Sequence, residues 1–248
     1  MAVDVVTKFD RARLPGAELD AVAKYAAKAA WPAGFSVYQR GSAADGLFIV
    51  LRGRIVLRSR VKAGRGFVPT VATEGETFGA EGIEASGRYT TDARADEPAE
   101  TLHLSGARFR ALLREQPAVA QALVAQFMAE RSALLEKLRE LATLSVEERL
   151  IASMLRLAEQ TQCADQSGAL TLGPAQYRLL CELVGATRES VSLVFNRLVG
   201  AGLVDRDGAT YTVPDSQALS SRLGAAWMET ESLVPIAVEG GAGHTVRI

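Results

Sequence analysis

The chain has 248 residues, 48% of them hydrophobic and 23% charged, a composition that excludes a disordered or fibrous protein. Its 28 basic and 29 acidic residues leave a net charge of −1, which excludes a protein that coats nucleic acid or a membrane by bulk charge. Two cysteines, Cys163 and Cys181, are too few for a disulfide framework or an iron–sulfur cluster, and two histidines, His103 and His244, leave little room for zinc or triad chemistry.

The first half of the sequence changes from a helical to a strand-rich pattern. An Ala-rich stretch from about Gly16 to Ala30 has helical spacing and ends at Pro32. Short β-rich runs separated by glycines then follow at intervals of about ten residues, which predicts a small antiparallel barrel or roll. These runs are Phe35–Val37, Leu47–Leu51, Ile55–Leu57, Phe67–Val71 and Thr101–Leu104.

A long helix is predicted from Pro117 to Leu144, because no Gly or Pro occurs inside this segment. At 1.5 Å per residue it would be about 40 Å long. Its apolar seam consists of Phe127, Leu134, Leu138 and Leu141, with Arg131 interrupting it. Such a helix either pairs with a second copy of itself or lies on its own domain; we predict pairing, because it would protrude far from so small a barrel.

Ser145 and Glu148 fit the capping box that starts a new helix. Further on, a helix is predicted from Pro174 to Val184, stopped by Gly185, and a second from Arg188 to Val199, capped by Thr187. Asp207-Gly208, between two short runs, is the preferred dipeptide of a two-residue hairpin. Helix, short turn, helix and hairpin together predict a winged helix-turn-helix.

These patterns divide the chain into four parts. We predict a β-roll sensing domain at 1–116, a dimerisation helix at 117–144, a winged helix-turn-helix at 145–215 and a C-terminal extension at 216–248. Leu219, Leu223 and Trp227 are spaced four apart, so the extension can form one more amphipathic helix. No basic leader and no run of roughly 18 apolar residues occurs, so a cytoplasmic protein without a membrane partner is expected.

Three motifs, in this order, resemble those of one family. The pattern Gly34-x-x-Val37-x-x-x-Gly41, followed by the run from Leu47 to Leu57, resembles the opening of a cyclic-nucleotide-binding β-roll. Phe78-Gly79-Ala80-Glu81 resembles the phosphate-binding cassette of that roll. The segment from Val184 to Ser192 resembles the turn and recognition helix of bacterial regulators.

In this order, over about Phe35 to Val213, the motifs are similar to those of the relatives of the cyclic-AMP receptor protein and the fumarate–nitrate reduction regulator, the Crp/Fnr family. The resemblance implies an α+β fold: an N-terminal antiparallel β-roll, a long dimerisation helix and a C-terminal winged helix-turn-helix. It also implies a homodimeric transcription regulator that binds a near-palindromic operator in double-stranded DNA. RNA polymerase is a further partner that the resemblance suggests.

By analogy with the family, the residues that read DNA are Thr187, Arg188, Glu189, Ser192 and Leu193. Arginine pairs with guanine and glutamate accepts from cytosine, although Arg188 and Glu189 can also be a solvated helix start. The family usually has an arginine where Leu193 stands, so the operator should differ from common family sites. Arg197 lies on the opposite helix face and does not replace it.

The predicted DNA-binding part is acidic. Residues 145–215 contain six arginines and nine acids, giving 6 − 9 = −3. Because DNA affinity depends heavily on phosphate neutralisation, we expect modest and strongly salt-dependent binding. An interaction module with weak or lost DNA binding is therefore the alternative function. An enzyme is not expected, because the usual hydrolase, metalloprotease and nucleotide fingerprints are missing.

The predicted effector site departs from the family pattern. Phe78 and Gly79 match the cassette, but Ala80 stands where the family has a glutamate, with Glu81 one place later. Tyr89 stands at the family's phosphate-binding arginine, between Arg88 and Thr90, and small insertions could still bring Arg88 and Glu81 into place. Leu134 and Leu135 stand where cyclic-AMP responders have two hydroxyl residues for the adenine.

We therefore predict a degenerate pocket without ordinary cyclic-AMP binding, since unpaired buried polar groups of the nucleotide would be costly. A different effector, or none, remains open. Neither haem nor an iron–sulfur cluster is expected, because no cysteine precedes Cys163 and His103 alone is more simply a strand residue. No metal site is expected.

Overall fold

The computed structural model describes residues 13–223 except 61–65, 85 and 162–168. The N-terminal half contains α1 (Gly16–Ala23), β1 (Ala27–Trp31), β2 (Ser36–Tyr38), β3 (Gly46–Arg52), β4 (Ile55–Arg60), β5 (Gly66–Ala72), β6 (Thr77–Phe78), the 3₁₀ helix η2 (Ala80–Ile83), β7 (Asp92–Ala95), β8 (Ala99–Ser105) and α2 (Gly106–Glu115). The C-terminal half contains α3 (Pro117–Thr143), α4 (Val146–Thr161), β9 (Leu170–Leu172), α5 (Pro174–Val184), α6 (Arg188–Gly200), β10 (Asp205–Asp207), β11 (Thr210–Val213) and α7 (Ser216–Ser221).

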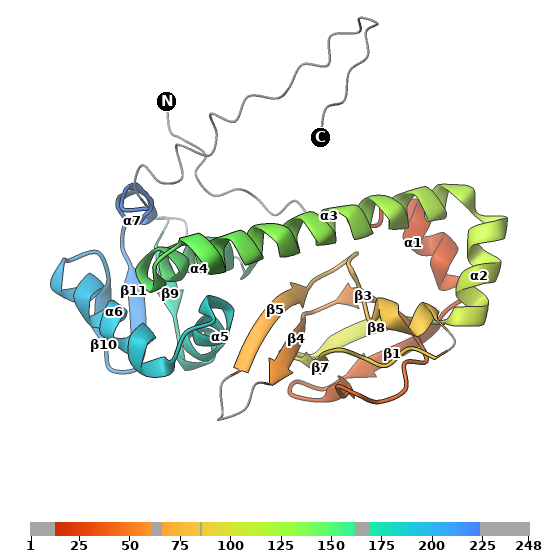
Figure 1. Ribbon diagram of the computed structural model, residues 1–248, viewed down its shortest axis with the longest axis horizontal. Coiled ribbons are helices and arrows are strands. Elements are labelled where there is room, and N and C mark those ends of the chain that lie inside the picture. Colours follow the sequence, from red (N-terminus) through yellow and green to blue (C-terminus); the bar gives the residue numbers. More distant parts are fainter. Residues whose placement is uncertain (1–12, 61–65, 85, 162–168, 224–248) are drawn as a thin grey trace, which may run out of the picture.

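The β-roll consists of two four-stranded antiparallel sheets, ordered β1-β8-β3-β6 and β2-β7-β4-β5. Aromatic and aliphatic side chains, among them Phe48, Phe78 and Tyr89, form a hydrophobic cluster between the sheets. The other face of the first sheet packs on α1, α2 and the start of α3 through Leu47, Ile49 and their neighbours (Figure 1). The predicted α+β architecture with an N-terminal roll is confirmed.

The predicted helix from Gly16 to Ala30 was wrong in its second part. The helix α1 ends at Ala23, and Ala27–Trp31 is strand β1, which pairs antiparallel with β8 from Ala27↔His103 to Trp31↔Ala99. Trp31 Nε1 also donates to Thr101 Oγ1 at 2.9 Å. Alanine favours helix locally, but pairing with a neighbouring strand overrides this weak preference.

The long helix α3 has 27 residues and matches its predicted extent. Its first turns are anchored in the roll by the buried side chains of Val119 and Leu123. Figure 1 shows α3 running along the whole β-roll to the C-terminal half. It ends where the predicted capping box forms: Glu148 Oε2 accepts from Ser145 N at 2.7 Å, and Ser145 Oγ accepts from Glu148 N at 3.2 Å.

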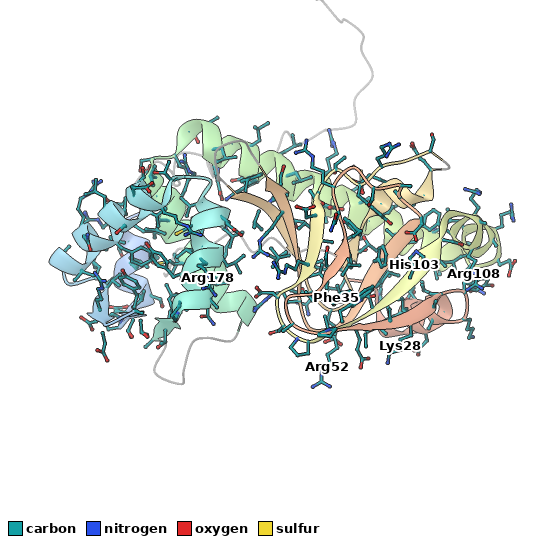
Figure 2. The ribbon with its side chains drawn as sticks, turned by 90° about the horizontal axis from the view of Figure 1, so that it is seen from below. Lys28, Phe35, Arg52, His103, Arg108 and Arg178 are labelled. Carbon is teal, nitrogen blue, oxygen red and sulfur yellow. The ribbon has the colours of Figure 1, made fainter. Side chains whose placement is uncertain are left out.

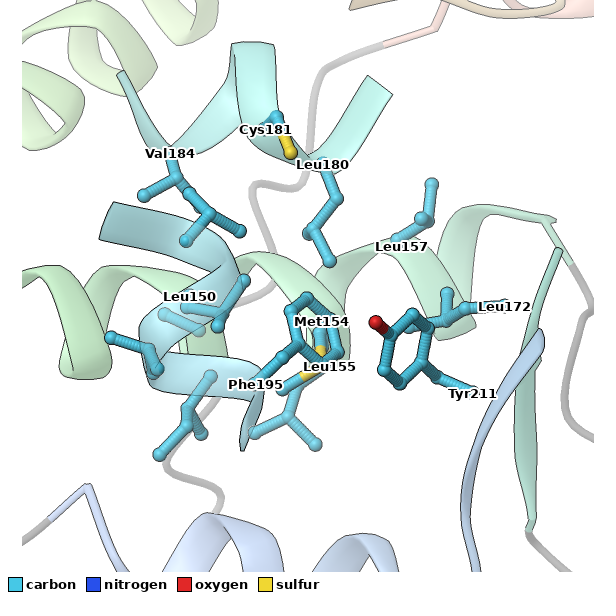
Figure 3. Packing of buried hydrophobic residues seen from close by; sticks show 14 of the residues in the cluster. Leu150, Met154, Leu155, Leu157, Leu172, Leu180, Cys181, Val184, Phe195 and Tyr211 are labelled. Atoms are coloured by element: carbon cyan, nitrogen blue, oxygen red, sulfur yellow. The ribbon is translucent and has the colours of Figure 1, made fainter. Parts of the chain in front are cut away.

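The C-terminal half is a winged helix-turn-helix with one strand more than predicted. The hairpin β10–β11 is extended by β9, which pairs with β11 from Tyr211↔Leu172 to Val213↔Leu170. Its core forms around the fully buried ring of Phe195, with the ring of Tyr211 at 4.4 Å and Met154 beside it (Figure 3).

The packing of this half continues beyond residue 215. The helix α7 is capped by Asp215, and Leu219 and Leu223 are both buried in the same hydrophobic cluster. The boundary at 215 therefore cuts through a packed region. The remainder of the predicted extension, with Trp227 and His244, and the loop that carries Cys163 lie outside the described residues.

The two halves pack directly on each other. Val56, Val68 and Val71 of the roll belong to the hydrophobic cluster of the winged helix-turn-helix. At the edge of this contact, Arg58 Nε donates to Glu182 Oε2 at 2.7 Å. Apolar burial is the main attraction between the halves, because a partly exposed ion pair adds only about 0–1 kcal/mol.

A buried ion cluster joins α3 to α4. The Glu140 carboxylate is fully buried and accepts from both terminal guanidinium nitrogens of Arg156, Nη1 and Nη2, with Nη2 3.0 Å from Oε2. Lys137 Nζ donates to Glu140 Oε2 at 3.4 Å. We call Lys137, Glu140 and Arg156 the Glu140 cluster; it fixes the side of α4 that faces α3.

We expect Glu140→Gln to lower the free energy of unfolding by about 3–5 kcal/mol, because the buried Lys137 and the partly buried Arg156 then lose this counter-charge. Urea unfolding followed by circular dichroism measures this loss. Glu136→Gln is the matched control, since Glu136 pairs with Arg139 on the same helix with both side chains about one third exposed. Its loss should be at most about 1 kcal/mol. Equal losses in the two variants would show that the Glu140 cluster has no special role.

Candidate functional site

The recognition helix α6 begins as the sequence predicts. Gly185 ends α5 in the left-handed conformation, with a φ of 66°. Thr187 Oγ1 then accepts from Ser190 N at 3.2 Å and caps α6. The left-handed glycine and the threonine cap are both local features, so together they fix the turn between α5 and α6 and the residue at which α6 begins.

The exposed face of α6 carries the predicted DNA-reading residues. Val191, Val194, Phe195 and Leu198 form its buried face. Arg188 and Glu189 are exposed, Ser192 is half-buried, and Leu193 is 59% exposed. Thr187 is half-buried because its hydroxyl serves the cap.

Asn196 is exposed on this same face, and the sequence analysis missed it. It follows Ser192 by one helical turn, and an asparagine amide can pair bidentately with adenine. The helical spacing from Arg188 could have identified it. Arg197 lies on another side of the helix, where its Nη1 is 3.7 Å from Glu147 Oε2.

Few of the arginines in this half are available to phosphates. Arg149 donates to the carbonyls of Leu144 at 2.8 Å and Val184 at 3.1 Å, so it ties the end of α3 to the end of α5. Arg156 is held in the Glu140 cluster. Arg178 is exposed on α5, well apart from Lys28 and Arg52 of the roll (Figure 2).

The cassette keeps its backbone geometry. Gly79 has a φ of 72° and precedes the short helix η2, which begins at Ala80. The Glu81 carboxylate accepts from Thr90 N at 3.0 Å and from the Thr90 hydroxyl, so it closes the cassette onto the following loop. Ala80 contributes no polar group.

A tyrosine occupies the position of the family's arginine, and it is packed inside the roll. The ring of Tyr89 stacks on that of Tyr38, with centroids 3.7 Å apart, and its hydroxyl donates to Asp45 Oδ1 at 2.8 Å. Burial raises the pKa of Tyr89, so the side chain stays neutral. Arg88 is exposed and donates to the Gly41 carbonyl at 2.7 Å, outside this packing.

Rings also surround the cassette glycine. A Cβ atom on Gly79 would lie 3.1 Å from Tyr89, 3.2 Å from Tyr38 and 3.3 Å from Phe48. Phe78 is buried and stacks on Phe48 at 5.1 Å. The structure thus brings Glu81 to Thr90 and Tyr89 to Gly79. Arg88 instead lies on the surface against Gly41.

The remaining predicted site residues lie elsewhere. Leu134 and Leu135 are both exposed on α3, and Leu134 also borders a small cavity beside β5. His103 lies in β8, with Nε2 3.4 Å from Asp45 Oδ1. Cys181 is buried, and burial raises the pKa of its thiol, so it acts as a packing residue of α5.

Comparisons with known proteins agree with this architecture. A family model for the cyclic nucleotide-binding domain matches residues 29–116, and one for the Crp-like helix-turn-helix domain matches residues 148–222. The cAMP-activated global transcriptional regulator CRP of Escherichia coli O6:H1 is 23% identical over 184 residues, covering 74% of this chain and 87% of that protein. The CRP-like cAMP-activated regulator of Mycobacterium tuberculosis is 22% identical, covering 77% of this chain and 86% of that protein.

Solved structures show the same fold. The c-di-GMP responsive regulator CLP of Xanthomonas campestris superposes with a TM-score of 0.72 at 20% identity, covering 81% of this chain and all of that one. FixK2 of Bradyrhizobium japonicum has a TM-score of 0.63 at 18% identity, covering 78% of this chain and 95% of the other.

Fold and site thus define a cyclic-nucleotide-type β-roll joined by a long helix to a DNA-binding winged helix-turn-helix, the class of bacterial transcription regulators. Within that class, this chain belongs to the Crp/Fnr family. Among the described residues no helix is long and apolar enough to cross a membrane.

Proposed function

We propose that this chain acts as a homodimeric, sequence-specific regulator that reads a near-palindromic operator through α6 and does not respond to ordinary cyclic AMP. One observation carries the DNA-reading role: the capped amino end of α6 exposes Arg188, Glu189 and Leu193, while its other face is buried. That is the presentation a recognition helix needs in a major groove.

The exposed face of α3 supports self-pairing. Five of the seven large exposed hydrophobic side chains of the described residues lie on α3: Val124, Met128, Leu134, Leu135 and Leu138. A coiled-coil seam repeats at alternating intervals of four and three residues. This spacing is kept by Val124, Met128, Leu135 and Leu138, with Arg131 at the central position. This seam differs from the predicted one, because Phe127 packs in its own domain and Leu141 lies against Gly185.

In a dimer that reads a near-palindromic operator, the two copies of α6 must lie about 34 Å apart across a two-fold axis, the spacing of successive major-groove faces. The proposed contacts with DNA are those predicted from the sequence, namely Thr187, Arg188, Glu189, Ser192 and Leu193, and Asn196 is added to them. Contact with RNA polymerase, a cytoplasmic location and the absence of haem and iron–sulfur cofactors stay predictions.

We expect Arg188→Ala to weaken binding to the preferred duplex roughly tenfold to a hundredfold, because a bidentate contact to guanine contributes about 1–3 kcal/mol. The duplex is first selected from random DNA with the wild-type protein, and the affinities are then measured by electrophoretic shift at fixed salt. Arg197→Ala is the matched control and should have a smaller effect, since Arg197 faces Glu147.

Unchanged binding by Arg188→Ala would refute the base-reading role of this residue. Selection that enriches no palindrome would instead favour the alternative, an interaction module with weak or lost DNA binding.

We expect Leu138→Glu to convert a dimer into a monomer, because two carboxylates would face each other in the seam of α3. Light scattering after size exclusion measures the molar mass. Phe35→Glu is the control: Phe35 is 52% exposed, against 63% for Leu138, but lies on the roll. A wild-type monomer, or a Leu138→Glu dimer, would contradict this assembly.

Cyclic AMP and cyclic GMP should not bind with micromolar affinity, because Tyr89 offers no charge to the phosphate and the rings of Tyr38, Phe48 and Tyr89 crowd the cassette glycine Gly79. Calorimetric titration of the purified full-length protein tests this expectation. Micromolar binding of either nucleotide would overturn it.

A further inference from the structure

The recognition helix α6 carries two chemically different sets of side chains on its outer side. Its first turn presents Arg188 and Glu189, which are exposed and charged. One to two turns further along the same side follow Ser192, Leu193 and Asn196, none of which carries a charge. Arginine pairs with guanine and glutamate with cytosine, and the later set contains neither residue type. The later set therefore needs base partners of another kind.

Leu193 exposes an aliphatic side chain on the side of α6 that faces away from the core. It is 59% exposed, and together with Phe35 it is one of two large exposed hydrophobic side chains of the described residues that lie outside α3. Its neighbours one helical turn away, Glu189 and Arg197, are exposed and charged, so no apolar patch continues from it along the helix. A single apolar side chain among charges is too little for the centre of a protein interface. In a major groove, however, the C5-methyl group of thymine is an apolar partner for it.

Asn196 adds a polar group of defined geometry near Leu193. Its side chain is exposed on α6, and its amide offers an oxygen acceptor beside an NH₂ donor. Adenine presents the complementary pair, an N6 donor beside an N7 acceptor, at its major-groove edge. Guanine presents two acceptors there, so it would leave the amide oxygen without a donor. Adenine is therefore the base that satisfies the Asn196 amide.

The spacing of these two residues places their contacts close together on the DNA. Side chains three residues apart on one helix have Cβ atoms about 5–6 Å from each other. Successive base pairs are about 3.4 Å apart along a strand. Leu193 and Asn196 can therefore reach the same base pair or two neighbouring pairs, and both residues favour A·T.

We propose that Leu193 and Asn196 read an A·T step in each half of the operator. The Asn196 amide pairs with N6 and N7 of an adenine, and the Leu193 side chain contacts the methyl group of a thymine in the same or the next base pair. Arg188 and Glu189 read G·C pairs beside this step. The inference rests on the proposed function and extends it, because it names the bases that the later part of α6 selects.

Removing a thymine methyl group from the DNA tests the role of Leu193 without changing the protein. The operator is first selected from random DNA with the full-length wild-type chain, and each thymine of one half-site is then replaced in turn by deoxyuridine. We expect one replacement to weaken binding about fourfold in electrophoretic shift at fixed salt, because one buried methyl group is lost. Leu193→Ala should abolish this penalty. It should persist in Arg197→Ala, the matched control, because Arg197 faces Glu147.

Replacing each adenine of the same half-site by 7-deazaadenine tests Asn196 in the same way, since this change removes the N7 acceptor. One replacement should weaken wild-type binding roughly fivefold through the lost hydrogen bond. Asn196→Ala should abolish this penalty and keep the deoxyuridine penalty, and Leu193→Ala should show the reverse. Each penalty is a ratio of two affinities of one protein, so a general loss of stability or of phosphate contacts cancels from it.

Absence of either penalty in the wild-type protein, or a penalty that persists in the corresponding variant, would overturn the A·T assignment and leave the proposed function in place. An enriched operator whose half-sites contain only G·C pairs would do the same. Selection that enriches no palindrome would instead overturn the proposed function, and this inference with it.

Discussion

The buried carboxylate of Glu140 is the constraint on which the arrangement of the molecule depends. It is fully shielded from water and held by Arg156 from α4 and Lys137 from its own helix. Such a cluster adds little net stability compared with apolar packing, but removing Glu140 takes the shared counter-charge from both Lys137 and Arg156. Its role here is geometric: only one rotation of α4 about its axis brings Arg156 to Glu140.

A second link carries that geometry towards α6. Arg149, two turns of α4 before Arg156, donates to the carbonyl ends of α3 and α5. Gly185 and Thr187 then set the turn into α6 through local backbone geometry. The buried carboxylate of Glu140 is therefore connected to the recognition helix by a series of specific contacts. The apolar contact of β4 and β5 with the winged helix-turn-helix helps to hold this arrangement.

In the β-roll, the backbone turn of the cassette lies beside an interior of aromatic side chains. The cassette glycine still adopts its left-handed turn, yet Tyr89 stacks on Tyr38 where the family has its arginine.

The sequence by itself determined the features that arise from contacts within a few residues. The ends of α3, α5 and α6, the Ser145–Glu148 capping box and the Asp207-Gly208 turn all match, because capping and turn geometry need no partner elsewhere in the chain. The same holds for the exposed face of α6, since its periodicity is local. Only the tertiary structure decided that Ala27–Trp31 is a strand, that Tyr89 lies inside the roll, that Phe127 faces its own domain and that Glu140 holds two cations. Each of these depends on contacts with residues brought together by folding, and such contacts leave no periodic signal in the sequence.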